Sequence, residues 1–235
     1  MRRGLPFDRA VLPLFVLGAL FLAARAWLTD HPQHDPWAPL DLRDPPGWAT
    51  RHKLAALRED PDECRAVLER SGVAYVALPA QGEGQCQRDD RTVLAGALLS
   101  PSAPPTTCAV GAGFELWLQQ GVQPAAQQFL GARVARIEHL GAYSCRRLYG
   151  RQEGGWSEHA TGNALDIAAF VLADGRRVSV ARDWRGEDAE AAFLRRARDE
   201  ACRMFGTVLS PDYNAAHADH FHLDQAQRMF RGVCR

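Results

Sequence analysis

The chain has 235 residues, and its 28 Lys and Arg residues balance its 28 Asp and Glu residues, so the formal net charge is zero. A protein that binds nucleic-acid phosphates normally carries an excess of basic residues, and this balance argues against that class. The shares of apolar residues (46%) and charged residues (24%) are those of a globular protein and not of a disordered one. The length allows one sizeable domain or at most two small ones.

An apolar run from residue 10 to residue 24 follows two arginines near the N-terminus. With Trp27 at its end, residues 10–28 predict a short membrane-spanning helix whose N-terminus stays in the cytoplasm. The sequence Ala24-Arg25-Ala26 also has the form of a signal-peptide cleavage site. We favour a signal anchor over residues 1–28, with a cleaved signal peptide as the alternative. Either one exports the rest of the chain, as a periplasmic domain on the inner membrane or as a protein secreted to the periplasm.

Residues 29–48 contain five prolines and little hydrophobic periodicity. Such a composition predicts a stiff, extended linker. The folded domain is therefore expected over residues 49–235.

The six cysteines all lie on the exported side, and no two are closer than 22 residues. This spacing excludes the paired CxxC motif of zinc ribbons and thioredoxins. An even number of cysteines in an oxidising compartment predicts three disulfides. Six cysteines allow fifteen pairings, and our working guess is the sequential one: Cys64–Cys86, Cys108–Cys145 and Cys202–Cys234.

Helix and strand signals are mixed through this domain. Asp60-Pro61-Asp62-Glu63 is typical of a helix start, and Asp174-Gly175 between two β-prone runs predicts a hairpin. In chain order, the expected helices span residues 61–70, 108–120 (ended by Gly121), 124–130 (ended by Gly131) and 187–205, and the expected strands span residues 73–78, 134–144, 164–172, 176–181 and 221–223. Because this order is not a regular βαβ series, we expect an α+β fold with a small antiparallel sheet, helices on its flanks and disulfides as staples.

Four of the eight histidines fall in two short segments, SEHATGNALDI (157–167) and HADHFH (217–222). In a strand, His220 and His222 point to the same side. In the first segment, Gly162 permits a turn that brings His159 beside Asp166. Two imidazoles and a carboxylate form a donor set suited to Zn²⁺ with one position left for water. Burying so many titratable groups without a metal or a hydrogen-bond network would be unfavourable.

These segments resemble the SxHxxGxAxD and HxH signatures of the LAS-type zinc peptidases, which include D-Ala-D-Ala carboxypeptidases and murein endopeptidases. The wider stretch from about residue 60 to residue 234 is similar to the bacterial extensin-like C-terminal domain, which shares GAYSCR (141–146), both histidine segments and the scatter of cysteines. The resemblance implies a Zn²⁺ site on the sheet, with His159, Asp166 and His222 as ligands.

The resemblance also implies roles for the neighbours of these ligands. Asp219 occupies the position of the carboxylate base of carboxypeptidase relatives, and His217 occupies that of a histidine in murein endopeptidases. His220 matches a histidine that lies beside the metal and assists catalysis. We favour Asp219 as the base, with His217 or His220 stabilising the oxyanion. Arg146 matches an arginine that binds the substrate carboxylate, and Arg147 competes with it by spacing.

The resulting expectation is an exported zinc-dependent peptidase that hydrolyses peptide bonds in peptidoglycan with a zinc-activated water. The alternative is a non-catalytic cell-wall binding module that zinc stabilises, and a weaker one is hydrolysis of a substrate outside the wall. The expected partners are peptidoglycan peptides and, through residues 10–28, the inner membrane. A nucleic-acid partner is not expected.

Overall fold

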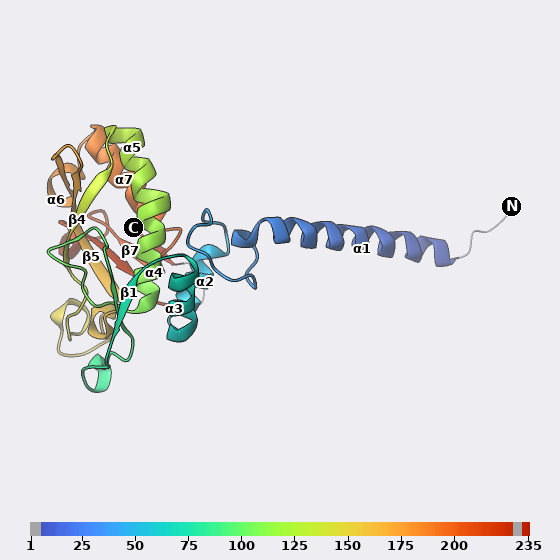
Figure 1. Ribbon diagram of the computed structural model, residues 1–235, viewed down its shortest axis with the longest axis horizontal. Coiled ribbons are helices and arrows are strands. Elements are labelled where there is room, and N and C mark those ends of the chain that lie inside the picture. Colours follow the sequence, from blue (N-terminus) through green and yellow to red (C-terminus); the bar gives the residue numbers. More distant parts are fainter. Residues whose placement is uncertain (1–5, 228–231) are drawn as a thin grey trace.

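A long helix projects from one side of a domain that combines helices with a sheet (Figure 1). The computed structural model describes residues 6–227 and 232–235. The main sheet lies on the side away from the projecting helix α1; α4 lies between the sheet and the helices α2 and α3, and α5 packs against α7 at the other end of the domain. The helices are α1 (Pro6–Asp30), α2 (Thr50–Ala56), α3 (Pro61–Arg70), α4 (Cys108–Trp117), α5 (Gln123–Leu130), α6 (Val180–Asp183) and α7 (Ala189–Ala201).

The main sheet has seven strands in the order β3-β4-β5-β8-β7-β9, with β6 paired to β5. Two pairs, β3–β4 and β7–β9, are parallel, and the others are antiparallel. The strands are β3 (Leu99–Ser100), β4 (Val134–Gly141), β5 (Ala164–Leu172), β6 (Arg177–Ser179), β7 (Thr207–Leu209), β8 (Phe221–Asp224) and β9 (Val233–Cys234). The predicted α+β class is confirmed. The prediction of a small antiparallel sheet is wrong, because strands of two or three residues are too short to show an alternating pattern.

Most of the longer predicted elements are confirmed. β5 covers the predicted residues 164–172, and Gly175 closes the predicted hairpin with a φ of +88°. The side chain of Asp60 caps α3 by accepting a hydrogen bond from the backbone N–H of Glu63 at 2.9 Å. The predicted strand 73–78 is β1 (Tyr75–Leu78), which forms a separate two-stranded sheet with β2 (Arg91–Leu94), a strand that we did not predict.

The helical rod of α4 and α5 differs from the prediction of two helices separated at Gly121. The chain stays helical through a π-helical turn over Leu118–Val122, and Figure 1 shows one continuous rod. A Cβ atom on Gly121 would lie only 2.8 Å from the Cβ atom of Glu200 near the end of α7. The glycine therefore allows two helices to approach closely and does not end a helix. The rod ends at Gly131, with a φ of +67°, as predicted.

Aromatic side chains join the helices to the sheet. Trp117 on α4 is fully buried, and its ring lies 6.0 Å from that of Phe170 on β5. Phe170 in turn contacts Phe193 on α7, with 5.0 Å between ring centroids. The indole N–H of Trp117 donates to the carbonyl oxygen of Ala197 at 2.8 Å, which satisfies its polar atom inside the core. Trp117 thus belongs to the core, and this packing holds β5 in place.

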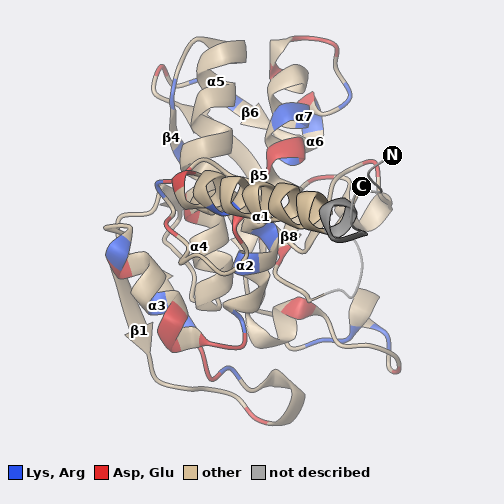
Figure 2. Cartoon of the chain, turned by 90° about the vertical axis from the view of Figure 1, so that its right-hand side faces the viewer, with Lys and Arg blue, Asp and Glu red and all other residues tan. Residues whose placement is uncertain are grey.

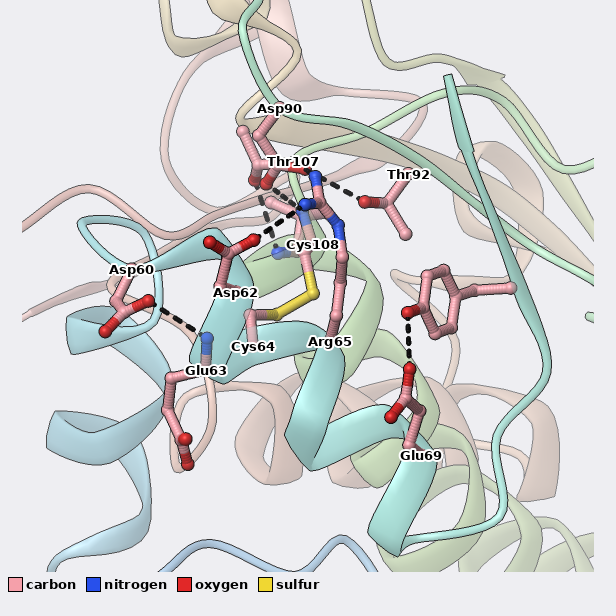
Figure 3. The surroundings of a disulfide bond; sticks show 12 residues. Asp60, Asp62, Glu63, Cys64, Arg65, Glu69, Asp90, Thr92, Thr107 and Cys108 are labelled. Atoms are coloured by element: carbon pink, nitrogen blue, oxygen red, sulfur yellow. Dashed lines mark hydrogen bonds and ion pairs between the residues drawn. A yellow bond between two sulfur atoms is a disulfide. The ribbon is translucent and has the colours of Figure 1, made fainter. Parts of the chain in front are cut away.

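The three disulfides confirm one of the guessed pairs and correct two. Cys202–Cys234 is formed as guessed, whereas the other bonds are Cys64–Cys108 and Cys86–Cys145. Cys64 on α3 meets Cys108 at the first residue of α4 because these two helices pack together. Figure 3 shows this bond among the polar side chains at that helix end. The order of cysteines along a chain does not encode such contacts, so the sequential guess had no physical basis.

The segment that follows α1 is packed against the domain, which differs from the predicted extended linker. Leu40 and Leu42 are buried, and the backbone N–H of Leu42 donates to the hydroxyl of Ser71 at 2.9 Å. Arg70 on α3 donates to the carbonyl oxygen of Leu40 at 3.1 Å. Since α1 continues to Asp30, little free chain remains between the projecting helix and the domain.

Lys53 is the only lysine of the chain, and it holds this segment in place. Its ammonium group is buried and donates to the carbonyl oxygen of Pro32 at 2.8 Å, and burial lowers its pKa. Replacing Lys53 with Met is expected to cost about 1–2 kcal/mol, because the half-buried carbonyl of Pro32 loses its charged donor while the apolar stem is kept. Trypsin should then cleave faster after Arg43. His52→Ala, at the exposed neighbouring position, is the control, and equal cleavage rates would contradict the assignment.

Candidate metal centre

Two adjacent strands place a carboxylate opposite an imidazole. Asp166 on β5 is the register partner of His222 on β8 in the antiparallel pair. Side chains of directly opposed residues lie on the same face of a sheet at close distance. The strand pairing alone therefore brings together two residues that are 56 positions apart in the chain.

The third member of the cluster comes from the turn before β5. His159 lies in a 3₁₀ turn over Glu158–Thr161. The hydroxyl of Ser157 accepts a hydrogen bond from the backbone N–H of His159 at 3.3 Å. Gly162 ends the turn with a φ of +70°, a conformation that favours glycine. The expectation that this glycine folds His159 back beside Asp166 is confirmed. Ser157 is buried and supports the loop.

The three side chains converge on one point. Nε2 of His159 lies 3.1 Å from Oδ2 of Asp166 and 3.1 Å from Nδ1 of His222, and Nδ1 of His222 lies 3.0 Å from Oδ1 of Asp166. Two ligand atoms of a tetrahedral Zn²⁺, each 2.0–2.1 Å from the ion, are about 3.3 Å apart. The separations in the cluster are close to this value, and its donors are two nitrogens and one oxygen. The three residues thus fit a divalent metal.

The outward nitrogen of each imidazole is held by a hydrogen-bond acceptor. Nδ1 of His159 bonds the carbonyl oxygen of Ala142 at 3.1 Å, and Nε2 of His222 bonds Oδ2 of Asp224 at 3.0 Å. Both partners only accept, so these ring nitrogens carry the proton and the inward nitrogens present their lone pairs to the cluster. Metal-binding histidines are commonly oriented in this way.

Charge within the cluster shifts the pKa values of its members in opposite directions. Burial alone would raise the pKa of Asp166, but hydrogen bonds and charge from His159 and His222 hold it well below its usual range. Burial opposes the charging of His222, yet its hydrogen bonds to Asp166 and Asp224 raise its pKa to about 9. The carboxylates of Asp166 and Asp224 thus stabilise a cation bound at the imidazoles, either a proton or a metal ion.

The other predicted site residues of the second histidine segment line one side of the cluster. Nε2 of His220 lies 3.7 Å from Oδ1 of Asp166, and Nδ1 of His220 bonds Oδ1 of Asp219 at 2.8 Å. The side chain of Asp219 is 64% exposed, so it reaches the cluster through His220. The ring of His217 lies 5.2 Å from that of His220 and 5.9 Å from that of His222. Burial, followed by the charges of His220 and His222, lowers the pKa of His217 to about 4.

A hydrogen-bond chain that sequence reasoning missed orients His217. Oδ1 of Asn214 accepts from the backbone N–H of Ala216 and bonds Nδ1 of His217 at 2.8 Å, and the Asn214 amide donates to the hydroxyl of Tyr149 at 3.2 Å. Tyr149 has a φ of +57°, the one positive value outside glycine in the described part of the chain. Such an outlier persists only where its surroundings hold it.

Asp224 was also missed, although the sequence contains a signal for it. It follows His220 and His222 at alternate positions, and side chains two residues apart in a strand share a face. Asn214 gives no such signal, because Asn before a short turn is ordinary capping chemistry.

The two candidate arginines differ in their environment. Arg147 stacks on the indole of Trp156, with 4.6 Å to the ring centroid, and donates to the carbonyl oxygen of Gly154. The side chain of Arg146 is exposed, and its charge contributes to the lowered pKa of His217. Arg146 therefore remains available to a ligand beside the cluster, whereas Arg147 and Trp156 build the loop.

Fold and site together define an α+β domain whose sheet bears a His/Asp/His cluster of metal-binding type, flanked by two further histidines. The chain belongs to the family described as "Extensin-like protein C-terminus", which matches residues 62–235. This confirms the extensin-like resemblance over nearly the whole folded domain. No curated protein and no solved structure matches the chain.

Proposed function

We propose that the protein is an exported zinc-dependent hydrolase that cleaves peptide bonds of peptidoglycan. The convergence of His159, Asp166 and His222 within hydrogen-bond distance of one another carries this proposal. These three residues would hold the ion. A bound Zn²⁺ supplies Lewis acidity, which polarises a carbonyl group and lowers the pKa of water.

The chain's own residues beside the cluster provide the proton chemistry. Asp219 accepts from Nδ1 of His220 and leaves Nε2 of that ring directed at the cluster, so the pair can take up a proton with the carboxylate stabilising the imidazolium. Asp219 then acts through His220, which refines the expectation that it is itself the base. His217, whose Nδ1 is bonded to Asn214, has its ring 5.2 Å from that of His220 and 5.9 Å from that of His222 and so lies beside the same space.

The substrate class follows from the charges at the rim of the site. Arg146 is exposed beside His217, and a guanidinium group binds a carboxylate through paired hydrogen bonds. Peptides with a free or side-chain carboxylate, such as the stem peptides of peptidoglycan, fit this arrangement. α1 contains one segment, Val11–Asp30, that is long and apolar enough to cross a membrane. We propose that it anchors the domain at the inner membrane, in the periplasm, where this substrate lies.

Digestion of purified sacculi by the full chain in detergent tests the activity. We expect new muropeptide fragments by mass spectrometry, their loss on chelation, and their return when Zn²⁺ is added back. Identical fragment profiles with and without the protein would contradict the proposal. If the protein digests sacculi equally well with and without a chelator, the proposed substrate stands and the proposed metal-dependent mechanism is wrong.

Asn214→Ala is expected to lower turnover about 10- to 100-fold, because His217 loses the acceptor that fixes its orientation. KM should change little, since the side chain of Asn214 bonds Tyr149 and His217 and none of its hydrogen bonds involves Arg146 among the described residues. The measurement is the rate of muropeptide release at several sacculus concentrations. Asn214→Asp, which keeps the acceptor oxygen, is the matched control and should retain most of the rate. An equal loss in both variants would contradict a positioning role.

A further inference from the structure

Three exposed tryptophans gather where α1 leaves the domain. The side chains of Trp27, Trp37 and Trp48 are 47%, 82% and 66% exposed, and they make up half of the chain's six tryptophans. Exposed aromatic clusters of this kind mark surfaces that meet an apolar partner. Indoles in particular favour places where one end of the ring is in apolar surroundings and the other end meets water.

Stacked rings join the projecting helix to the surface of the domain. Trp27 stacks on His31 and His34, with ring centroids 4.5 Å and 5.2 Å apart, and His34 stacks on Trp48 at 6.2 Å. The backbone N–H of Trp48 also donates to Nδ1 of His34 at 3.3 Å. The aromatic surface is therefore continuous from the last turns of α1 to the domain.

The base of α1 is fixed to the domain by polar contacts. Lys53 bonds the carbonyl oxygen of Pro32, and Arg25 lies 3.7 Å from the carboxylate of Asp35. Asp35 also accepts from the backbone N–H of Trp37 at 3.0 Å. The direction of α1 thus determines how the domain sits relative to anything that α1 enters.

The length of α1 sets the depth of these rings in a bilayer. The 20 residues of Val11–Asp30 rise about 30 Å as a helix, which equals the hydrocarbon thickness of a typical membrane. Trp27 then lies within one turn of the boundary of the hydrocarbon. Trp48, which is connected to Trp27 through one histidine ring, lies next to the headgroup layer.

We propose that Trp27, Trp37 and Trp48 insert into the interfacial layer of the phospholipid bilayer that α1 crosses, so that the domain is docked on the membrane and does not extend from it. The proposal rests on the membrane anchor of the proposed function and adds a lipid-binding surface to it. Figure 2, which looks along α1 onto this face, shows acidic and basic residues interspersed. Indole insertion is therefore the source of the interaction, and attraction of a polybasic patch to anionic lipid is not.

A hollow beside Trp48 suits a lipid headgroup. It has a volume of about 350 Å³, and its lining includes His34, Trp48, Arg51 and Arg203. Arg203 is paired with Glu200 at 3.0 Å, whereas the described residues provide no acidic partner for Arg51. Arg51 is thus the group of this face that can contact a lipid phosphate.

Fluorescence quenching by brominated phospholipids tests the docking. The full chain is reconstituted into vesicles of zwitterionic lipid, its insertion is measured by flotation, and its emission is compared with that of a Trp37→Phe/Trp48→Phe variant. If the six indoles emit equally, bromine near the headgroup should quench about half of the wild-type emission and about a quarter of that of the variant. Trp156→Phe, at the loop beside the metal cluster, is the matched control and should not reduce the quenched share.

Each other outcome overturns the docking. If the chain floats with the vesicles but the double variant is quenched to the same share as the wild type, the anchor stands and the docking does not. A chain that does not float contradicts the anchor and the docking together. If the emission of Trp37 and Trp48 shifts with protein concentration in detergent and is insensitive to brominated lipid, the face binds a second copy of the chain.

Discussion

Replacing His159 with Ala is expected to abolish peptide hydrolysis while the domain stays folded. His159 supplies one of the two nitrogens of the cluster, and its Nε2 contacts both other members at 3.1 Å. Two remaining donors are too few for a stable zinc site. Losing several kcal/mol of transition-state stabilisation lowers turnover on the order of a thousand-fold. The free energy of unfolding should fall by only about 1–2 kcal/mol, because the disulfides and the aromatic core lie outside the cluster.

Muropeptide release, zinc content and thermal unfolding, measured on the same preparations, separate catalysis from structure. If zinc only stabilises a cell-wall binding module, His159→Ala should unfold the domain as a chelator does.

Asp224→Asn keeps His159, Asp166 and His222 but weakens the hydrogen-bond acceptor of His222. We expect the rate of muropeptide release to fall about 10- to 100-fold. His52→Ala, on the exposed side of α2, should change none of the three readouts. Full activity of His159→Ala would refute the assignment of the site.

Removing the Cys64–Cys108 disulfide is expected to cause the largest loss of stability among the three. The bond closes a loop with a sequence separation of 44 residues, for which chain entropy alone predicts about 4 kcal/mol. Cys86–Cys145 closes a longer loop of 59 residues, but chain entropy rises only slowly with length and Cys145 is exposed, so burial of the bond decides the order. Both cysteines are fully buried, so a double Cys→Ala variant also loses packing. Guanidinium unfolding of the full chain in detergent, followed by tryptophan fluorescence, measures the change.

Polar contacts around this disulfide would remain in the variant. Oδ2 of Asp90 accepts from the backbone N–H of Cys108 at 2.5 Å, Oδ1 accepts from Thr92 at 2.9 Å, and Arg65 lies 3.5 Å away (Figure 3). This network keeps α3 and the start of α4 near each other in the folded state. Removing the disulfide should therefore lower stability mainly by increasing the conformational entropy of the unfolded chain.

The matched control removes Cys202–Cys234, with a separation of 32 residues. Its cysteines are partly exposed, so its removal should cost less than that of the buried bond. If this control were the more destabilised variant, burial would not be the deciding factor. A change below about 1 kcal/mol in both variants would contradict the chain-entropy account.

The residues of the cluster were predictable because they lie in two short segments whose local geometry, together with the family resemblance, points to them. His159, Gly162 and Asp166 lie within eight residues, and a turn that only glycine adopts easily sets their geometry. The alternation of side chains along a strand placed His220 and His222 on one side. Local rules of this kind need no knowledge of the rest of the chain.

The contacts that orient these residues were not predictable, because they join segments that only the fold brings together. The carbonyl oxygen of Ala142 faces His159 from β4's outgoing loop, and Asn214 reaches Tyr149 across 65 residues. Gly121 was read as a helix end because its actual role, the approach of α7, depends on a partner far along the chain.

The sequence by itself determined the α+β class, the apolar first helix and the longer strands. Each of these follows from local periodicity, turn chemistry or residue type, which act over a few positions. The three residues of the His/Asp/His cluster were indicated by the same local rules together with the family resemblance. Tertiary structure alone decided the size of the sheet and the packing of residues 31–48 onto the domain. It also decided that Cys64 pairs with Cys108 and Cys86 with Cys145. These depend on which apolar surfaces bury each other, and neither the neutral net charge nor the spacing of the cysteines along the chain records that choice.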